Sequence, residues 1–425
     1  MNVNILVGKS LIFLVSLAIM LPILSPQRIN AESLPSAKAK EAALSPFDEV
    51  WQKVYDHFYD PRFSGIDWKA MGEKYRLPAA QAKSADALAE TVNRMLAELK
   101  TSHTRLYTKT EPEYYQLLAI FSKGPMGEEI RRLFPDGKLH YPGIGVFTRE
   151  VGGRTFISGV LEGSPAHVAG LRIGDRIISV DRAVYRSIDS FAGRTGRMVK
   201  VAVQPTQDPK SVREVTVVPE EIDPSDVFLK AMKESVRVIE QEGRKIGYVH
   251  VWSYAGEQYH ELLTGEIAFG RLKDADALIL DLRDGWGGAN PVYLNLFNPK
   301  VPVLTNIDRS GKKTDVDFQW RKPVAMLVNG GTRSGKEILA YGFKKYGIGK
   351  VIGTRTAGAV IGGRPFLLQD GSLLYLASVG TLVDGEQLEG KGVAPDIEIH
   401  FPLEYAQGKD PQIARAVREL LKEIK

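Results

Sequence analysis

VAMLVNGGTRSGKEI, residues 324–338, is the stretch that decides how the rest of the chain is interpreted. An apolar, β-type run ends in Asn-Gly-Gly, and Ser334 and Gly335 then open a helical segment. The first N–H groups of a helix have no partner inside the helix, so a hydroxyl placed there has hydrogen-bond donors beside it. The pattern therefore favours a nucleophilic Ser334 at the edge of a sheet.

A phosphate loop is the second interpretation of the same residues. Gly330, Gly335 and Lys336 have the spacing Gly-x-x-x-x-Gly-Lys. Glu337, however, stands where a serine or threonine would ligate magnesium, and the N-terminal segment predicts export away from ATP. If Ser334 is instead a nucleophile, Lys336 is only a cation on the helix surface beside Glu337, pointing away from Ser334.

A serine hydroxyl becomes a useful nucleophile when a base removes its proton and donors hold the oxyanion. We expect Gly335 to supply one backbone N–H. Gly287 or Gly288, just after a buried strand that ends near Asp284, would supply the second, and the sequence does not separate these two glycines. The alternative is that each glycine pair is an ordinary tight turn.

The candidate base is one of seven histidines. His103 directly follows a predicted helix and lies among small polar residues, Thr101, Ser102 and Thr104, from which an imidazole can reach a cleft. The other histidines have no comparable local motif. Because a lone histidine is more often structural, His103 needs support from elsewhere in the chain.

Composition excludes several classes of site. The 425 residues leave room for two or three domains, and 44% hydrophobic with 25% charged residues is an ordinary globular composition. A net charge of +5 is too mild to indicate nucleic-acid binding, so we predict no nucleic-acid partner. The absence of cysteine excludes a thiol nucleophile, disulfides and thiolate metal sites.

The N-terminus predicts export. Lys9 precedes the uncharged apolar run Leu11–Leu24, and small and polar residues follow up to Ala31. We interpret residues 1–31 as a secretory signal cleaved after Ala31, which places the protein in a periplasm, outside the cell or in an equivalent lumen. The alternative is an uncleaved single-pass anchor, although the run is short for a membrane span.

Three regions with different sequence patterns follow along the chain. Together they predict the α/β fold class, in a multidomain (α+β) architecture. Residues 45–135 read as an N-terminal helical domain that carries His103. Residues 139–220 alternate short strands with glycine turns, as expected of a compact β-rich module. Residues 222–425 alternate strands and helices, which predicts a layered α/β core.

Individual elements follow from periodicity. Phe47–Tyr59 and Ser84–Leu99 have apolar residues at helical spacing, with Ser84 as an N-cap. Lys230–Gly243 is predicted to be a connecting helix. Residues 246–254 and 277–284 are predicted strands, the second buried on both faces.

Four motifs in a fixed order resemble those of the C-terminal processing (tail-specific) peptidases and their tricorn-like relatives. They are Asp-Leu-Arg-Asp-x-x-Gly-Gly at 281–288, Asn-Gly-Gly-x-x-Ser-Gly-x-Glu-Ile at 329–338, Gly-x-x-Thr-Ala-Gly at 353–358, and the segment 389–397 with its Gly-Val-x-Pro-Asp. The β-rich module resembles a PDZ domain, on Gly143-Ile144-Gly145-Val146 and on the segment 164–175.

The resemblance implies specific roles. The Ser-Lys branch of these peptidases carries a lysine after the next strand, but Ala359 occupies the matching segment. The tricorn-like branch uses serine, histidine and glutamate, which match Ser334, the Ser102-His103 pair and Glu389. On this resemblance His103 is the base, and Glu389 orients it, with Ser102 as an intermediary.

The implied function is an exported serine endopeptidase that cleaves protein or peptide substrates without a metal or cofactor. Its PDZ module would hold a substrate C-terminus by strand addition at Gly143, Ile144, Gly145 and Val146. The alternative is a catalytically inactive, PDZ-bearing scaffold on a peptidase fold, which the missing lysine motivates. The joint presence of serine, histidine and glutamate favours the enzyme.

Overall fold

The computed structural model describes residues 44–424. The predicted signal segment 1–31 and its cleavage site lie outside the described residues, so export stays a prediction. In the part of the chain that is described, no helix is both long enough and apolar enough to cross a membrane.

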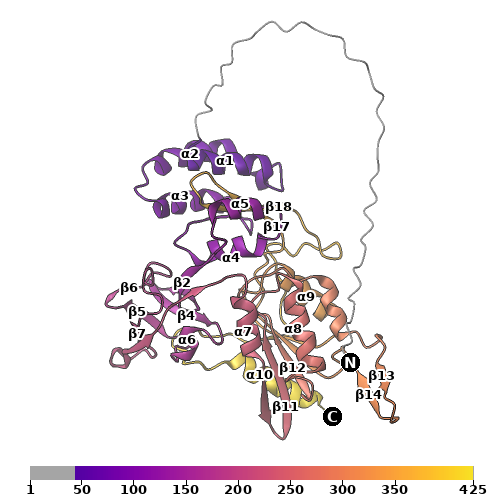
Figure 1. Cartoon of the computed structure of the whole chain (residues 1–425). Helices are drawn as coiled ribbons and strands as arrows, with labels where there is room; N and C mark the ends of the chain where they lie inside the picture. The colour runs from indigo at the N-terminus through magenta and orange to yellow at the C-terminus, as the bar shows by residue number, and fades with distance from the viewer. Residues whose placement is uncertain (1–43, 425) are drawn as a thin grey trace, which may run out of the picture. The chain divides into compact units, whose positions relative to one another are not determined.

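A six-stranded sheet forms the centre of the C-terminal half, in the order β10-β11-β12-β15-β16-β19 (Figure 1). Its strands are β10 Arg237–Gln241, β11 Arg244–His250, β12 Ala277–Asp281, β15 Val324–Val328, β16 Lys350–Gly353 and β19 Ile397–Glu398. All neighbours are parallel except β10, which pairs antiparallel with β11 at one edge. Every residue of β12 and β15 is buried, because helices cover both faces of the sheet.

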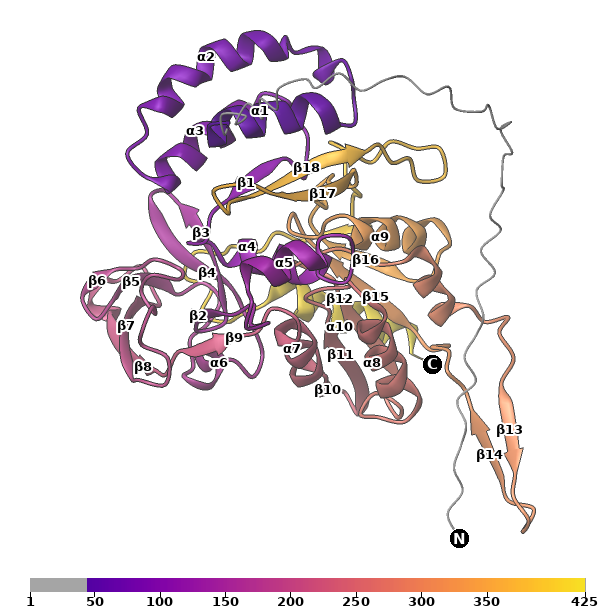
Figure 2. The same ribbon diagram turned by 45° about the horizontal axis from the view of Figure 1, so that its top comes forward.

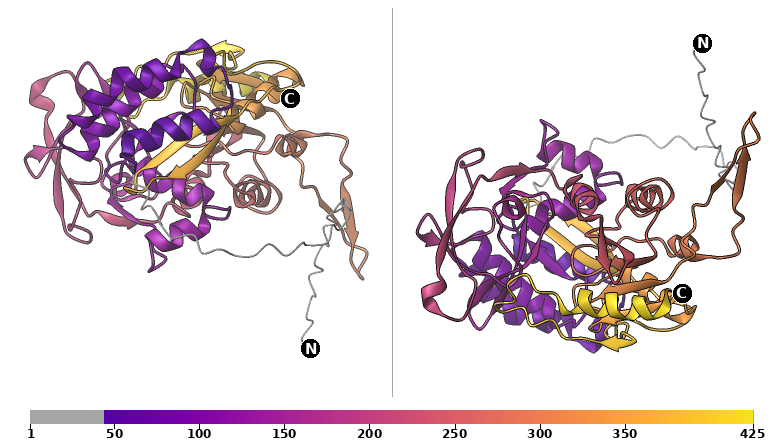
Figure 3. Two further views of the ribbon diagram at one scale, coloured as in Figure 1. Left: turned by 90° about the horizontal axis from the view of Figure 1, so that it is seen from above. Right: turned by 90° about the horizontal axis from the view of Figure 1, so that it is seen from below.

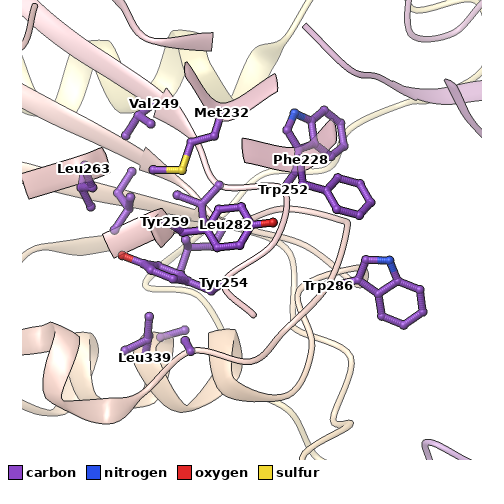
Figure 4. Packing of buried hydrophobic residues seen from close by; sticks show 14 of the residues in the cluster. Phe228, Met232, Val249, Trp252, Tyr254, Tyr259, Leu263, Leu282, Trp286 and Leu339 are labelled. Atoms are coloured by element: carbon purple, nitrogen blue, oxygen red, sulfur yellow. The ribbon is translucent and has the colours of Figure 1, made fainter. Parts of the chain in front are cut away.

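Four helices form the outer layers: α7 Val227–Ser235, α8 Glu257–Ala268, α9 Gly335–Lys345 and α10 Pro411–Glu423. Leu278 and Leu280 of β12 belong to the core that includes residues of α7, α8 and α9. Ile279, on the opposite face of the same strand, belongs to the core beneath α10. Figure 3 shows α10 lying alone across its side of the sheet, and Figure 4 shows the packing in the first core.

One predicted element is wrong. The helix expected over 230–243 ends at Ser235, and residues 237–241 form β10 instead. The β-branched Val238 and Ile239 can extend the sheet here, because the edge of β11 is open to antiparallel pairing. The guanidinium of Arg237 lies over the Tyr248 ring, 3.7 Å from its centroid, which adds a contact across the two strands.

The β-rich module is a separate antiparallel sheet in the order β3-β4-β5-β7-β8, with β6 paired to β5. Its elements are β3 Val146–Val151, β4 Arg154–Val160, α6 Pro165–Val168, β5 Arg176–Val180, β6 Ala183–Val184, β7 Val199–Gln204, η2 Pro209–Ser211 and β8 Arg213–Val217. It has its own apolar core, which includes Ile157, Phe191 and Val201. The chain enters and leaves it through the paired strands β2 Tyr141–Gly143 and β9 Glu220–Ile222.

The N-terminal helices pack on strands from the other end of the chain (Figure 2). The N-terminal elements are α1 Pro46–His57, η1 Phe63–Gly65, α2 Trp68–Ala80, α3 Ala85–Ala97, β1 Arg105–Tyr107, α4 Pro112–Phe121 and α5 Gly127–Leu133. As predicted, Ser84 caps α3 by accepting a hydrogen bond from the Ala87 N–H. β1 pairs with β18 Leu373–Val379, which pairs with β17 Gly362–Leu367.

The helical, PDZ-like and layered parts confirm the predicted fold class. The exact domain limits stay predictions. Between β12 and β15 the chain forms η3 Pro291–Phe297, a 3-10 helix, and a two-stranded hairpin, β13 Leu304–Ile307 and β14 Lys313–Val316. This hairpin projects from the rest of the core (Figure 2).

Candidate active site

Ser334 lies in a strained turn at the carboxyl end of β15. Its φ of 57° and ψ of −131° are unusual for a residue with a side chain. The Ser334 N–H donates to the Ala359 carbonyl at 2.8 Å and to Glu337 Oε1 at 3.2 Å. Such a conformation persists only where the surroundings hold it, and it concentrates at functional sites.

Glu337 supplies much of that support. Its carboxylate is fully buried and accepts hydrogen bonds from Thr356 Oγ at 2.6 Å, the Gly358 N–H at 2.6 Å and the Ala359 N–H at 2.7 Å. Burial raises the pKa of Glu337, and these donors oppose the rise. Glu337 is buried because the 356–359 segment folds over the first turn of α9.

Lys336 is buried as well, which corrects its assignment as a helix-surface cation. Its side chain has no exposed area, and Nζ donates to the carbonyl oxygens of Trp252 at 3.2 Å and Asp284 at 2.9 Å. Burial lowers the pKa of Lys336 to about 7. Lys336 is not among the residues that line the cleft with Ser334, and its hydrogen bond to Asp284 anchors the start of the 284–288 loop.

His103 shares a cleft with Ser334. It lies between α3 and β1, has a positive φ of 53°, and stacks on the Tyr375 ring with 5.1 Å between centroids. Burial and, to a smaller extent, the Arg333 guanidinium lower the pKa of His103 to about 4, against the opposing effect of the Glu389 carboxylate. The imidazole is therefore neutral at pH 7 and free to accept a proton.

Glu389 reaches this site through Ser102. It accepts hydrogen bonds from the Ser102 N–H at 2.9 Å and from Ser102 Oγ at 3.1 Å. The N–H groups of Val360 and Ile361 donate to the same carboxylate at 2.9 and 3.2 Å. Among the described residues no hydrogen bond joins Glu389 to the His103 ring, so their interaction is electrostatic and positional.

The two candidate oxyanion glycines have different surroundings. A Cβ on Gly287 would lie 2.5 Å from Ser334 Cβ and 3.2 Å from the Gly335 nitrogen. Gly288 has a φ of 90°, and a Cβ there would lie 2.6 Å from Ala255 Cα instead. Within residues 44–424, the N–H groups of Gly287, Gly288 and Gly335 make no hydrogen bond. Unpaired donors beside a serine hydroxyl are the groups that an oxyanion hole needs.

The cleft is a cavity of about 430 Å³ with a mostly apolar wall. Leu117 and Phe121 of α4 line it, together with Tyr107, Trp286 and Tyr375. Arg105 and Arg333 line it too. Sequence reasoning missed this wall, because α4 and β18 are remote from the motifs, and it missed Arg333 although that residue lies inside the decisive stretch.

The proposed peptide-binding loop is closed in this structure. Gly143, Ile144, Gly145 and Val146 surround a cavity of about 20 Å³, roughly the space of one water molecule. Tyr141 and Gln116 also line it. Gly145 has a φ of 77°, and a Cβ there would lie 2.3 Å from Ser164 Cβ, so only glycine fits. A peptide carboxylate can enter only if this loop opens.

Metal ligands are not gathered in the part of the chain that is described. Between residues 44 and 424, no group of three or more His, Cys, Asp or Glu side chains is placed to hold an ion.

Comparison with known families agrees with this geometry. Residues 245–399, which contain the central strands and Ser334, match the model described as peptidase family S41. This match covers about a third of the chain. Residues 156–193 match a PDZ domain and residues 41–97 match the tricorn protease C1 domain. The chain is thus similar to a serine peptidase family over its α/β core and to a PDZ domain over part of the β-rich module.

Its relatives come from both branches of this group. The chain is 27% identical to the chloroplastic carboxyl-terminal-processing peptidase 3 of Arabidopsis thaliana, over 93% of this chain and 78% of the relative. It is 26% identical to tricorn protease homolog 1 of Streptomyces coelicolor, over 87% of this chain. The chain spans only about a third of the length of the tricorn relatives that it matches.

The crystal structure of the tricorn protease has the same fold. The superposition has a TM-score of 0.52 at 21% identity, and it covers 89% of this chain and 36% of the tricorn chain. The shared fold includes the sheet whose carboxyl edge carries Ser334 here.

Proposed function

We propose that this chain is a serine endopeptidase in which Ser334 is the nucleophile and His103 is the general base. The observation that carries the proposal is the convergence, in one cleft, of a strained serine, a neutral histidine and unpaired backbone N–H groups. Three chain segments far apart in sequence supply these groups. Their meeting is hard to explain by packing alone.

The reaction follows the acyl-transfer scheme. The unprotonated imidazole nitrogen of His103 takes the proton from Ser334 Oγ as Oγ bonds to the substrate carbonyl carbon. The carbonyl oxygen becomes an oxyanion, held by the N–H groups of Gly335 and Gly287. Of the two candidate glycines we propose Gly287, because it is the one in contact with Ser334.

Collapse of the tetrahedral intermediate breaks the peptide bond. His103 gives its proton to the leaving amine, and the acyl group stays on Ser334. Water then attacks the acyl-enzyme, with His103 again accepting a proton, and the carboxylic acid product leaves. Glu389 and Ser102 act as positioning residues, because they fix the backbone and the charge next to His103 without touching its ring.

The finer parts of the proposal concern substrate and location. We propose that the protein is exported and that the PDZ module engages substrate C-termini at Gly143–Val146. The glycine-only geometry of this loop supports engagement, provided that the loop opens. Binding of fluorescent peptides that end in a free carboxylate, against the same peptides as amides, tests it. Equal binding of both forms would overturn tail recognition.

Labelling with a fluorophosphonate probe tests the catalytic assignment. Wild type should be labelled, and Ser334→Ala and His103→Ala should lose labelling by about a thousandfold or more. His400→Ala is the matched control, because its side chain is 86% exposed and does not line the cleft. Labelling that survives His103→Ala would reject His103 as the base. Folded wild type that is never labelled would reject the peptidase and favour a binding role.

A further inference from the structure

Arg333 is a cation in the cleft that no carboxylate of residues 44–424 neutralises. It precedes Ser334 directly, is only partly buried, and lines the same cavity as His103. Its guanidinium lies over the Trp286 ring, 4.9 Å from the centroid. This contact holds the head group against the cleft wall and leaves the N–H donors at its edge free.

No acidic side chain is in ion-pair contact with Arg333 among residues 44–424. Arg105, the other arginine of the cleft, is bound to Glu111 at 2.5 Å. Glu389 is occupied by four donors from other residues. The charge of Arg333 slightly opposes the rise in the pKa of Glu113 that burial causes, but the two residues make no ion pair. The Arg333 guanidinium therefore lies in the cleft as a permanent positive charge without an ion-pair partner among the described residues.

An unpaired guanidinium next to a catalytic base is disadvantageous without a ligand. Its charge disfavours protonation of His103, the step on which the proposed reaction depends. A bound carboxylate would neutralise that charge at the moment of catalysis. The positive potential in the cleft would therefore stabilise an anion bound beside Ser334.

We propose that Arg333 is a carboxylate-binding subsite of the cleft, so that preferred substrates carry a carboxylate close to the scissile bond. This inference rests on the proposed peptidase function. The apolar wall of Leu117, Phe121 and Tyr375 faces the same cavity, so the preferred sequence pairs an apolar residue with that carboxylate. Bidentate pairing with a guanidinium fork is the geometry that arginine favours for carboxylates.

The carboxylate has two possible sources. An Asp or Glu side chain near the cleaved bond would make the enzyme selective for acidic sites. The C-terminal carboxylate of a short substrate tail would instead direct cleavage to the last few residues. Both use the same ion pair, and substrate design separates them.

The experiment uses the full-length enzyme and internally quenched peptides of one parent sequence with an apolar residue before the cleaved bond. One series moves a Glu, or a Gln as its neutral match, through three positions on each side of that bond. A second series ends the peptide one to four residues after the bond, as the free acid or as the amide. We expect a preference of about tenfold to a hundredfold in kcat/KM for the charged member at one position.

Three variants assign that preference. Arg333→Gln should abolish it, Arg333→Lys should keep part of it, and Arg333→Glu should reverse it in favour of a Lys-bearing peptide. Arg309→Gln is the matched control, because Arg309 is exposed at the tip of the β13–β14 hairpin. A preference that survives in Arg333→Gln belongs to the PDZ module or another site and overturns the inference.

The two proposals fail differently. Loss of fluorophosphonate labelling in wild type would reject the peptidase itself. Labelled, active wild type that shows no preference in either peptide series would reject only the carboxylate subsite. This second result needs no variant, so misfolding of an Arg333 substitution cannot obscure it.

Discussion

Replacing Glu337 by Gln should weaken the nucleophile turn while changing almost no volume. The carboxylate accepts four hydrogen bonds: Oε1 from the Ala359 and Ser334 N–H groups, and Oε2 from Thr356 Oγ and the Gly358 N–H. A glutamine has one acceptor oxygen, and its NH₂ group must face one of these pairs of donors. In either orientation two charge-assisted hydrogen bonds are lost. The NH₂ group, a donor, then also faces at least one backbone N–H group, which is a donor too.

The expected loss follows from these contacts. Hydrogen bonds to a charged group contribute about 1.5–3 kcal/mol each, so two lost bonds cost about 3–6 kcal/mol. Removing a fully buried charge returns part of this, because burial itself raises the pKa of Glu337 and so opposes ionisation. We expect the free energy of unfolding to fall by about 2–4 kcal/mol. We also expect a fall in kcat, because in either orientation the turn around Ser334 loses two of the four contacts that this carboxylate makes.

Urea unfolding followed by tryptophan fluorescence measures the first effect, and fluorophosphonate labelling rates measure the second. Glu386→Gln is the matched control, since Glu386 is exposed and accepts one bond, from the Tyr341 hydroxyl at 2.8 Å. It should change stability by no more than about 0.5 kcal/mol. If Glu337→Gln is as stable and as reactive as this control, the carboxylate does not hold the turn and the reasoning is wrong.

Three further changes probe the same cleft. Gly287→Ala should abolish labelling, because the added Cβ would lie 2.5 Å from Ser334 Cβ. Gly330→Ala is the control and should be near neutral, because nothing lies within 4 Å of a Cβ there. Equal activities of the two variants would contradict the close approach of Gly287 to Ser334. Ser102→Ala should lower kcat about three- to tenfold with KM unchanged, because it removes one of four donors to the glutamate; a KM effect alone would argue against a positioning role. In the dependence of kcat/KM on pH, the acid limb should lie near the His103 pKa of about 4. In Arg333→Gln this limb should move to higher pH, because loss of the positive charge favours the imidazolium form of His103. An acid limb at pH 6.5 in both wild type and variant would refute this.

Local features of the chain were predictable because their causes are local. The apolar runs that become β12 and β15 are strongly patterned and are bounded by Asp and Gly turns. Ser84 caps its helix through atoms three residues away. The glycine turn before Ser334 allowed a nucleophile, and the resemblance of the ordered motifs to those of a known peptidase group indicated a serine peptidase, with which the family comparison agrees.

Burial of the residues after Ser334 was not predictable. Helix geometry gives the relative direction of Lys336 and Ser334, but not what lies in that direction. The surroundings of Lys336 and Glu337 are the loops after β11 and β12 and the segment 356–359 after β16. The sequence shows those loops only as separate turns, so Lys336 looked like a surface cation and nothing indicated the burial of Glu337 beside it.

The sequence by itself determined the residue types of the site: a serine in a glycine turn, a Ser-His pair, a glutamate before Gly-Val-x-Pro-Asp and two glycines after a buried strand. Tertiary structure decided their mutual positions. Pairing of β1 with β18 brings Ser102 to Glu389 across 287 residues, and packing places Gly287 rather than Gly288 against Ser334. Packing of distant segments also leaves the Arg333 guanidinium without an acidic side chain in ion-pair contact among residues 44–424. Local patterns record what each segment prefers, whereas neighbours and net local charge arise only when segments meet.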